Sequence, residues 1–229
     1  MSVLRLEHVG KQYLTEGVPV VALDDVSLEF QAGEFVALLG RSGCGKSTLL
    51  NLAGAMDFPT SGTVAINGMV TSQLNDAGLT RLRRESVGFV FQAFQLLPTL
   101  SVVENVELPL LLAGGAGERE AALAQLRWVE LEGYADRMPY QLSGGQAQRV
   151  AIARALIHSP RLILADEPTG NLDSSTSDLI LSLLRAVASE QNTTVLMATH
   201  SAEAASIADT LVRLHDGRVV ETRQAMARR

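Results

Sequence analysis

The stretch Gly40-Arg41-Ser42-Gly43-Cys44-Gly45-Lys46-Ser47 decides the fold, because it fits the phosphate-loop pattern G-x-x-x-x-G-K-[ST]. It follows the apolar run 35–39 and precedes a leucine-rich segment, a context that predicts a strand, a loop and a helix. The glycines then let backbone N–H groups converge on phosphate oxygens, and the helix N-terminus adds partial positive charge. A glycine-rich turn with a solvated lysine is the simpler alternative, which the flanking strand and helix disfavour.

The loop residues have separate expected roles. Lys46 is expected to reach the β- and γ-phosphates of a bound nucleotide, and the Ser47 hydroxyl is expected to bind Mg²⁺. The nucleotide contacts predicted for this stretch are Gly40, Arg41, Ser42, Gly43, Cys44, Gly45, Lys46, Ser47 and Thr48. The motif alone indicates a P-loop nucleoside triphosphatase.

Two acidic residues end a second buried strand. The apolar run from Arg161 to Ala165 delivers Asp166 and Glu167 at its C-terminal end. Asp166 is placed to hold a metal ion, usually through water, and Glu167 to polarise the attacking water. Such a pair can also cap the next helix or bind an arginine.

Two further polar residues end apolar strands. Gln92 closes the predicted strand 87–91, and its amide can bridge Mg²⁺ and the attacking water. His200 follows the predicted strand 194–198, where a histidine can donate a hydrogen bond to a γ-phosphate. Each residue alone would be an ordinary surface side chain.

Hydrophobic periodicity predicts an α/β fold. Alternating runs indicate a small antiparallel β layer, and continuous apolar runs indicate a mostly parallel sheet with crossover helices. Between Gln92 and about Pro160 the strand pattern gives way to helical spacing, which indicates an inserted helical subdomain. We therefore expect a single domain over 1–229, in which 1–91 and 161–229 form a P-loop NTPase core and 92–160 form the helical subdomain.

Composition bounds the function. The 229 residues carry a net charge of −6, which argues against a surface that coats nucleic acid. The single cysteine, Cys44, excludes an intrachain disulfide and suggests a reducing compartment. No apolar run approaches the length of a membrane span, so a cytoplasmic location is expected. The mean hydropathy of +0.17 suggests that some apolar surface is buried against partner chains.

From Leu4 to about Val220, these elements taken together resemble the ATPase subunit of ATP-binding-cassette (ABC) transporters. In that family's terms, residues 40–47 look like the Walker A loop, and residues 162–166 look like the Walker B strand. The other matches are Gln92 (Q-loop), Leu142-Ser143-Gly144-Gly145-Gln146 (signature), Glu167 (catalytic glutamate), residues 171–173 (D-loop) and His200 (switch histidine). Tyr13 sits where such ATPases place an aromatic ring that stacks on adenine, although it can equally be a packing residue.

The resemblance implies Mg²⁺-dependent ATP hydrolysis, with Glu167, His200 and Lys46 as catalytic residues. It assigns Ser47, Gln92 and Asp166 to the metal. Further nucleotide contacts are expected from Tyr13, Gln92, Ser143, Gly144, Gly145, Gln146 and Asp173.

The signature has a physical interpretation of its own. Ser143 is expected to start a helix, where its hydroxyl, the Gly145 N–H and the helix dipole face an anion. In isolation, a plain helix cap with two glycines would be the simplest interpretation. Because the helical insertion carries the signature away from the chain's own phosphate loop, we expect it to meet the ATP of another subunit in a head-to-tail homodimer.

Finer similarity narrows the class. Five runs look like those of bacterial ATPases in the lipoprotein-releasing and macrolide-exporter group. They are Leu82-Arg83-Arg84, Val87 to Gln92, Leu96-Leu97-Pro98, Glu104-Asn105-Val106 and Pro168 to Asp173. Membership implies an integral membrane permease partner, a peripheral position at the inner membrane, and an output of export, lipoprotein release or mechanotransmission. Regulation of cell-envelope or division machinery without transport is the alternative. Ser201, which follows His200, departs from the acid common at that position.

Part of one apolar set after Gln92 is expected to form a groove for a cytoplasmic helix of the membrane partner, and the remainder to be core. The set is Phe94, Leu96, Leu97, Val102, Val103, Leu108 and Leu110. The resemblance implies that substrate contacts belong mostly to the membrane subunits.

Overall fold

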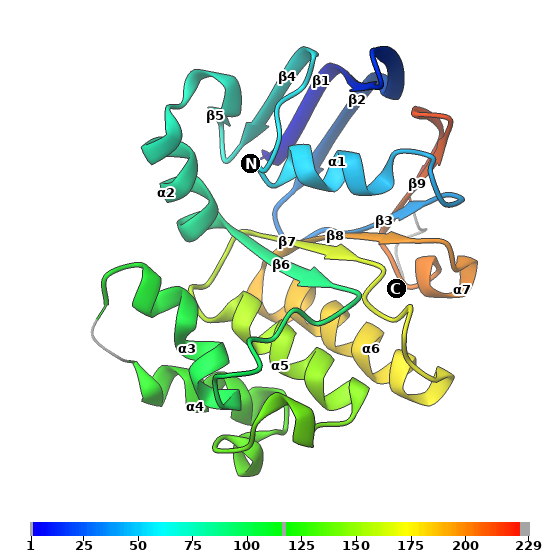
Figure 1. Cartoon of the computed structure of the whole chain (residues 1–229). Helices are drawn as coiled ribbons and strands as arrows, with labels where there is room; N and C mark the ends of the chain where they lie inside the picture. Colours follow the sequence, from blue (N-terminus) through cyan, green and yellow to red (C-terminus); the bar gives the residue numbers. More distant parts are fainter. Residues whose placement is uncertain (1, 116–117, 225–229) are drawn as a thin grey trace.

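The protein consists of two β-sheets with helices packed against them, as the computed structural model shows for residues 2–115 and 118–224 (Figure 1). The ends of the predicted domain, residue 1 and residues 225–229, lie outside this part. The α/β class, the mostly parallel sheet and the antiparallel layer are all present, so the predicted fold class is confirmed.

The smaller sheet is antiparallel, with strand order β2-β1-β4-β5. Its strands alternate between a buried and an exposed face; in β1, for example, Leu4 and Leu6 are buried and Arg5 is exposed. The bounds are β1 Ser2–Thr15, β2 Val18–Gln31, β4 Ser61–Ile66 and β5 Met69–Val70.

The larger sheet has strand order β10-β9-β3-β8-β7-β6, and all neighbours except β10 and β9 are parallel. The C-terminal ends of the parallel strands meet at one edge, where loops place functional side chains. The bounds are β3 Phe35–Leu39, β6 Val87–Phe91, β7 Leu162–Asp166, β8 Thr194–Thr199, β9 Thr210–His215 and β10 Arg218–Gln224.

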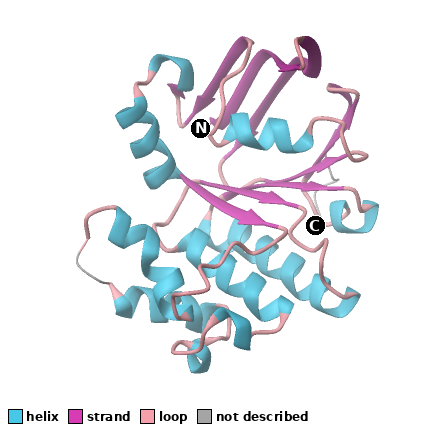
Figure 2. Ribbon diagram, in the orientation of Figure 1, coloured by secondary structure: helices cyan, strands magenta, loops and turns pink. Residues whose placement is uncertain are grey.

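Helices cover both faces of this sheet (Figure 2). Alternate residues of β3 divide between two cores: Val36 and Leu38 pack on the side of α1, whereas Phe35 and Ala37 pack on the side of α5 and α6. Helix α1 lies between the two sheets, as Figure 1 shows. The bounds are α1 Lys46–Ala53, α2 Asp76–Ser86, α5 Gly144–Leu156, α6 Ser174–Gln191 and α7 Ala202–Ala205.

The chain between β6 and β7 is helical and has a hydrophobic core of its own. Helices α3 (Val102–Leu112) and α4 (Arg119–Trp128) pack with α5 around Val106, Leu126 and Val150. The fully buried Asn105 anchors the start of α3 through hydrogen bonds with backbone groups of Leu97 and Leu100. The boundaries of a separate subdomain at 92 and 160 stay a prediction.

Candidate functional site

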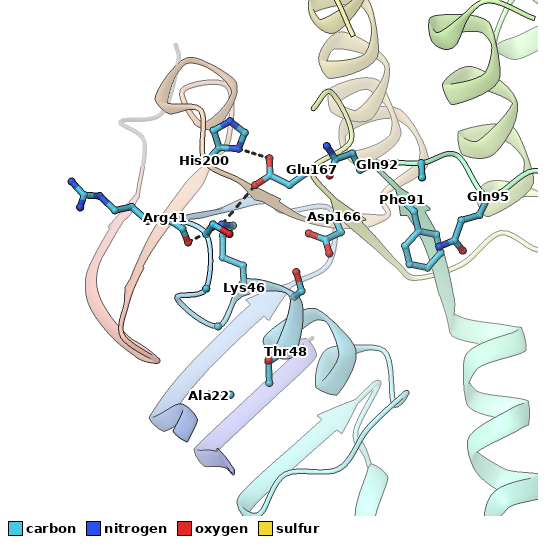
Figure 3. A pocket seen from close by; sticks show the side chains of 15 residues that line it. Ala22, Arg41, Lys46, Thr48, Phe91, Gln92, Gln95, Asp166, Glu167 and His200 are labelled. Atoms are coloured by element: carbon cyan, nitrogen blue, oxygen red, sulfur yellow. Dashed lines mark hydrogen bonds and ion pairs between the residues drawn. The ribbon is translucent and has the colours of Figure 1, made fainter. Parts of the chain in front are cut away.

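A cavity of about 960 Å³ opens at the C-terminal edge of the parallel sheet (Figure 3). Segments far apart in the sequence meet there: the loop after β3, the ends of β6 and β7, and the residue after β8. The lining residues are Ala22, Arg41, Ser42, Gly43, Gly45, Lys46, Ser47, Thr48, Phe91, Gln92, Ala93, Gln95, Asp166, Glu167 and His200.

The phosphate loop folds as its glycines predict. Gly43 and Gly45 have φ angles of 79° and 105°, in the left-handed region that glycine adopts without strain. A Cβ at Gly45 would lie 2.5 Å from the Ala22 carbonyl oxygen, so no larger residue fits. Helix α1 starts directly after this turn, and its N-terminus faces the cavity.

Lys46 is held inside the loop with its ammonium turned to the acid pair. Only 7% of the residue is exposed, and Nζ donates to the carbonyl oxygens of Gly40 at 2.8 Å and Arg41 at 3.2 Å. The same nitrogen lies 3.7 Å from Oε1 of Glu167. A buried cation is thereby placed beside the space that a phosphate chain would occupy.

Asp166 and Ser47 form a hard-oxygen donor pair. Burial raises the pKa of Asp166, and this effect outweighs the hydrogen bond from Ser47 and the charge of Lys46, which both lower it. A divalent cation at this carboxylate would offset the cost of its burial. Mg²⁺ prefers one or two protein oxygens with phosphate and water as its other ligands, so this pair fits Mg²⁺.

Glu167 is held in an unusual backbone conformation. Its φ angle is 47°, a left-handed value that costs a non-glycine residue on the order of 1–3 kcal/mol. Its N–H donates to the Ala198 carbonyl and its own carbonyl accepts from the Gly170 N–H, both at 3.0 Å. This strained turn presents the side chain to the cavity.

The Glu167 carboxylate lies between two basic groups, as the dashed lines in Figure 3 show. Oε2 is 2.9 Å from Nδ1 of His200, and Oε1 faces Lys46. An imidazolium at His200 can donate Nδ1–H to Glu167 and still offer Nε2–H to a phosphate oxygen. Of the three residues predicted to be catalytic, Lys46 and His200 therefore both contact Glu167.

Gln92 lines the cavity and is bound to the turn after the acid pair. Its Nε2 donates to Oδ1 of Asn171 at 3.1 Å, and Nδ2 of Asn171 donates back to the Gln92 carbonyl at 3.2 Å. A Cβ at Gly170 would lie 2.7 Å from the Gln92 Nε2. Its role as a metal ligand stays a prediction.

The signature begins helix α5 as expected. The Ser143 hydroxyl accepts from the Gln146 N–H at 3.3 Å, and the Gln146 side chain accepts from the Ser143 N–H at 2.9 Å. None of the four residues 143–146, all described, lines the cavity. A Cβ at Gly145 would lie 2.3 Å from Cγ2 of Thr176, so α5 packs closely on the start of α6.

Four other predicted contacts do not line the cavity. Asp173 caps α6, and hydrogen bonds from the Ser175 hydroxyl and the Thr176 N–H and hydroxyl hold its pKa well below its usual range. The Cys44 side chain is 6% exposed and packs in the core, and Gly40 lies against it.

The fourth, Tyr13, is 38% exposed on β1 and donates a hydrogen bond of 2.9 Å to Asp57. Burial and, after it, the hydrogen bond to Asp57 raise the pKa of Tyr13. A further hydrogen bond with Thr48 places Tyr13 beside the start of α1.

Some lining residues were not predicted. Phe91, Ala93 and Gln95 flank Gln92, and their place next to it was the signal that could have found them. Ala22 belongs to the distant strand β2, and only the tertiary structure brings it to the loop.

Residues 23–170 match the ABC transporter family. The chain belongs to this family. Its resemblance to ABC transporter ATPases is thus confirmed, and the protein is an ABC ATPase. It is 46% identical to the "Uncharacterized ABC transporter ATP-binding protein MJ0796" of Methanocaldococcus jannaschii, with 94% of each chain covered.

A second set of relatives is longer. The ABC ATPase is 45% identical to "Macrolide export ATP-binding/permease protein MacB" of Brucella melitensis, over 95% of this chain and 34% of that protein. The chain therefore spans about a third of MacB's length.

Solved structures agree with the fold. A structure described as a dimeric, post-hydrolysis state of the ATP-binding cassette MJ0796 bound to ADP and Pi has a TM-score of 0.89 at 44% identity and covers 96% of this chain and 98% of that one. The cbiO1 protein of Clostridium perfringens, part of a cbiONQ ABC transporter complex, has a TM-score of 0.87 at 29% identity, over 97% and 88%. In the part of the chain that the structure describes, no helix is long and apolar enough to cross a membrane.

Proposed function

We propose that this ABC ATPase hydrolyses ATP with Mg²⁺ as a head-to-tail homodimer, and that the cycle drives a separate membrane subunit in export, lipoprotein release or mechanotransmission. One observation carries this proposal. Lys46, Asp166, Glu167 and His200 line one cavity, whereas the signature residues 143–146 of the same chain lie outside it. A second copy can supply the signature that the cavity lacks.

The chain's own residues account for binding and hydrolysis. Lys46 and the N–H groups at the start of α1 bind the phosphates through charge-assisted hydrogen bonds. Glu167, held by His200 and by its strained backbone, orients the attacking water and accepts its proton. His200 donates a hydrogen bond toward the charge that develops on the transferred phosphoryl group.

Ser47 and Asp166 would hold Mg²⁺, with Gln92 as a further proposed ligand. When bound there, Mg²⁺ would supply positive charge that offsets the negative charge of the phosphates.

The signature completes the site from the other copy. The exposed Ser143 and Gly144 stand at the N-terminus of α5, where a hydroxyl, backbone N–H groups and the helix dipole favour an anion. The dimeric MJ0796 structures support dimerisation. Loss of the γ-phosphate then removes the contact that joins the two copies, and the dimer reopens.

A second cavity fits the membrane partner. This groove, of about 470 Å³, lies between β6, α2 and α3 and is lined by Phe89, Leu108 and Leu112, with the basic residues Arg83 and Arg84 beside them. We propose that an amphipathic cytoplasmic helix of the permease, with acidic residues flanking its apolar face, docks here. The MacB relatives, which are named ATP-binding/permease proteins, support a permease partner.

The apolar set after Gln92, of which only part was expected to form a groove, includes both core residues and a groove residue. Val102 and Val103 are fully buried in the helical core, whereas Leu108 does line the groove.

The test is co-purification of the tagged chain from native membranes, with mass spectrometry of the partner. A multispanning permease should be recovered, Leu108→Asp should lose it, and Leu111→Asp, which alters an exposed residue outside the groove, should keep it. Recovery of division or wall-regulating proteins alone would favour the alternative function. Equal recovery with both variants would contradict the groove.

A further inference from the structure

Gln148, in the second turn of α5, is a fully buried polar residue with one specific partner. Its exposed fraction is 0%, and Nε2 donates a hydrogen bond of 2.8 Å to the carbonyl oxygen of Pro168. Its Oε1 is also buried and accepts no hydrogen bond from the part of the chain that the structure describes. The Gln148 side chain thus makes the hydrogen bond to Pro168 while its own oxygen atom stays unpaired within the described residues.

This geometry determines the orientation of the amide. A reversed side chain would point Oε1 at the Pro168 carbonyl, so two acceptors would face each other. A buried polar group with an unpaired acceptor is unfavourable, and an apolar residue of similar volume would avoid it. The retained hydrogen bond to Pro168 therefore calls for a functional explanation.

The partner of Gln148 adjoins the strained glutamate. Pro168 directly follows Glu167, whose φ angle of 47° must be maintained by its surroundings. Hydrogen bonds to Ala198 and Gly170 hold the Glu167 peptide groups. Because proline has no N–H, its carbonyl oxygen is the one backbone polar group through which the next position can be held, and Gln148 holds it.

The same helix carries the signature. Ser143 begins α5, and Gly145 packs on Thr176 in the segment that follows Glu167. Helix α5 therefore contacts the chain after Glu167 both through Gly145 and through the hydrogen bond from Gln148.

We propose that Gln148 is a positioning residue, through which the signature helix holds Glu167 in its catalytic conformation. It acts through the backbone of Pro168 and does not touch the substrate. The inference rests on the proposed role of Glu167 in hydrolysis. It adds that Glu167 is held in place by the same helix that is proposed to meet the second copy.

The test is the steady-state ATPase rate of Gln148→Leu and Gln148→Met, which keep the volume and remove the donor. We expect kcat to fall about 10- to 100-fold, because small misplacements of a catalytic group have effects of that size, while KM stays within about twofold. Gln125→Leu in α4 is the matched control, since Gln125 also has a buried oxygen without a partner but is remote from the acid pair. It should leave kcat unchanged.

A second measurement separates positioning from a general structural role. In a Glu167→Gln background, Gln148→Leu should cause no further loss of single-turnover rate, because the side chain that it positions is already disabled. The melting temperature and ATP affinity of Gln148→Leu should match the unmutated protein.

The inference is wrong if kcat is unchanged, if KM and melting temperature change with kcat, or if the rate falls further in the Glu167→Gln background. Failure of the proposed function looks different, because Glu167→Gln by itself would then retain full turnover.

Discussion

The phosphate loop and the signature are both glycine-containing helix N-termini, yet the fold treats them differently. At the phosphate loop, left-handed Gly43 and Gly45 and the nearly buried Lys46 line a cavity. At the signature, Gly145 is helical, Ser143 caps its own helix, and the surface is open. Under the proposed function, the first helix start therefore binds phosphate within its own chain, and the second is a face that meets another copy.

The largest expected effect is on the rate of ATP hydrolysis, measured separately from ATP binding, in a variant of Glu167 beside the phosphate loop. Glu167→Gln should lower kcat by about 10²- to 10⁴-fold, the usual contribution of a general base. ATP affinity should be retained, because Lys46 and the loop N–H groups are unchanged. Steady-state ATPase assays with equilibrium nucleotide binding measure both, and a variant with normal turnover would contradict the role of Glu167.

The next effect falls on binding itself. Lys46→Ala should weaken ATP affinity by about 10- to 100-fold, since hydrogen bonds to charged groups contribute about 1.5–3 kcal/mol. Fluorescent-nucleotide titration measures this, with Arg119→Ala on α4 as a charge-matched control. An unchanged ATP dissociation constant for Lys46→Ala would contradict the proposal that the phosphate-loop helix start binds the nucleotide within its own chain.

A third prediction compares the two glycines directly. Gly145→Ala should destabilise the fold by about 1–3 kcal/mol, because its Cβ overlaps the Thr176 methyl group. Thr176→Ser removes that methyl group and keeps the hydroxyl that binds Asp173, so the double variant should recover stability. Gly45→Ala should not be recovered by Thr176→Ser, because its clash is with the Ala22 backbone.

Urea unfolding of the two glycine variants, each with and without Thr176→Ser, measures this difference against the unmutated protein. A double variant as unstable as Gly145→Ala alone would show that Thr176 packing is not the reason for glycine at that position.

The smallest effect concerns the cap of α6 beside the signature. In the folded protein, hydrogen bonds lower the Asp173 pKa from its ordinary value of 3.8. The unfolded chain therefore binds a proton at Asp173 more readily than the folded chain does. The ionised cap accordingly stabilises the fold above about pH 4. That contribution is lost as the pH falls through the folded-state pKa. The difference in unfolding midpoint between the unmutated protein and Asp173→Ala should therefore shrink on acidification, and a constant difference would contradict the assignment.

The sequence predicted those parts of the fold and site that depend on local patterns. The bounds of β3 and β6 agree with continuous apolar runs, and Ser143 was recognisable as a helix start. Strands β9 and β10 were missed, because they form the end of the sheet, where short, partly exposed strands lack a continuous apolar run.

Features that depend on tertiary contacts could not be read from the chain. The left-handed backbone of Glu167 results from hydrogen bonds to Ala198 and Gly170. Cys44 belongs to a phosphate-loop motif, yet its side chain is core. The bond from Gln148 to Pro168 joins residues 20 positions apart and leaves no sequence pattern.

The central claim, that each ATP lies between the phosphate loop of one copy and the signature of another, is tested most directly by mixing two inactive variants. Lys46→Ala disables the loop and Ser143→Arg blocks the signature, so each alone should be inactive in ATPase assays. In a head-to-tail heterodimer, one site combines an intact loop with an intact signature, and an equal mixture should regain up to about a quarter of the active sites. A mixture no more active than its separate components would contradict the account.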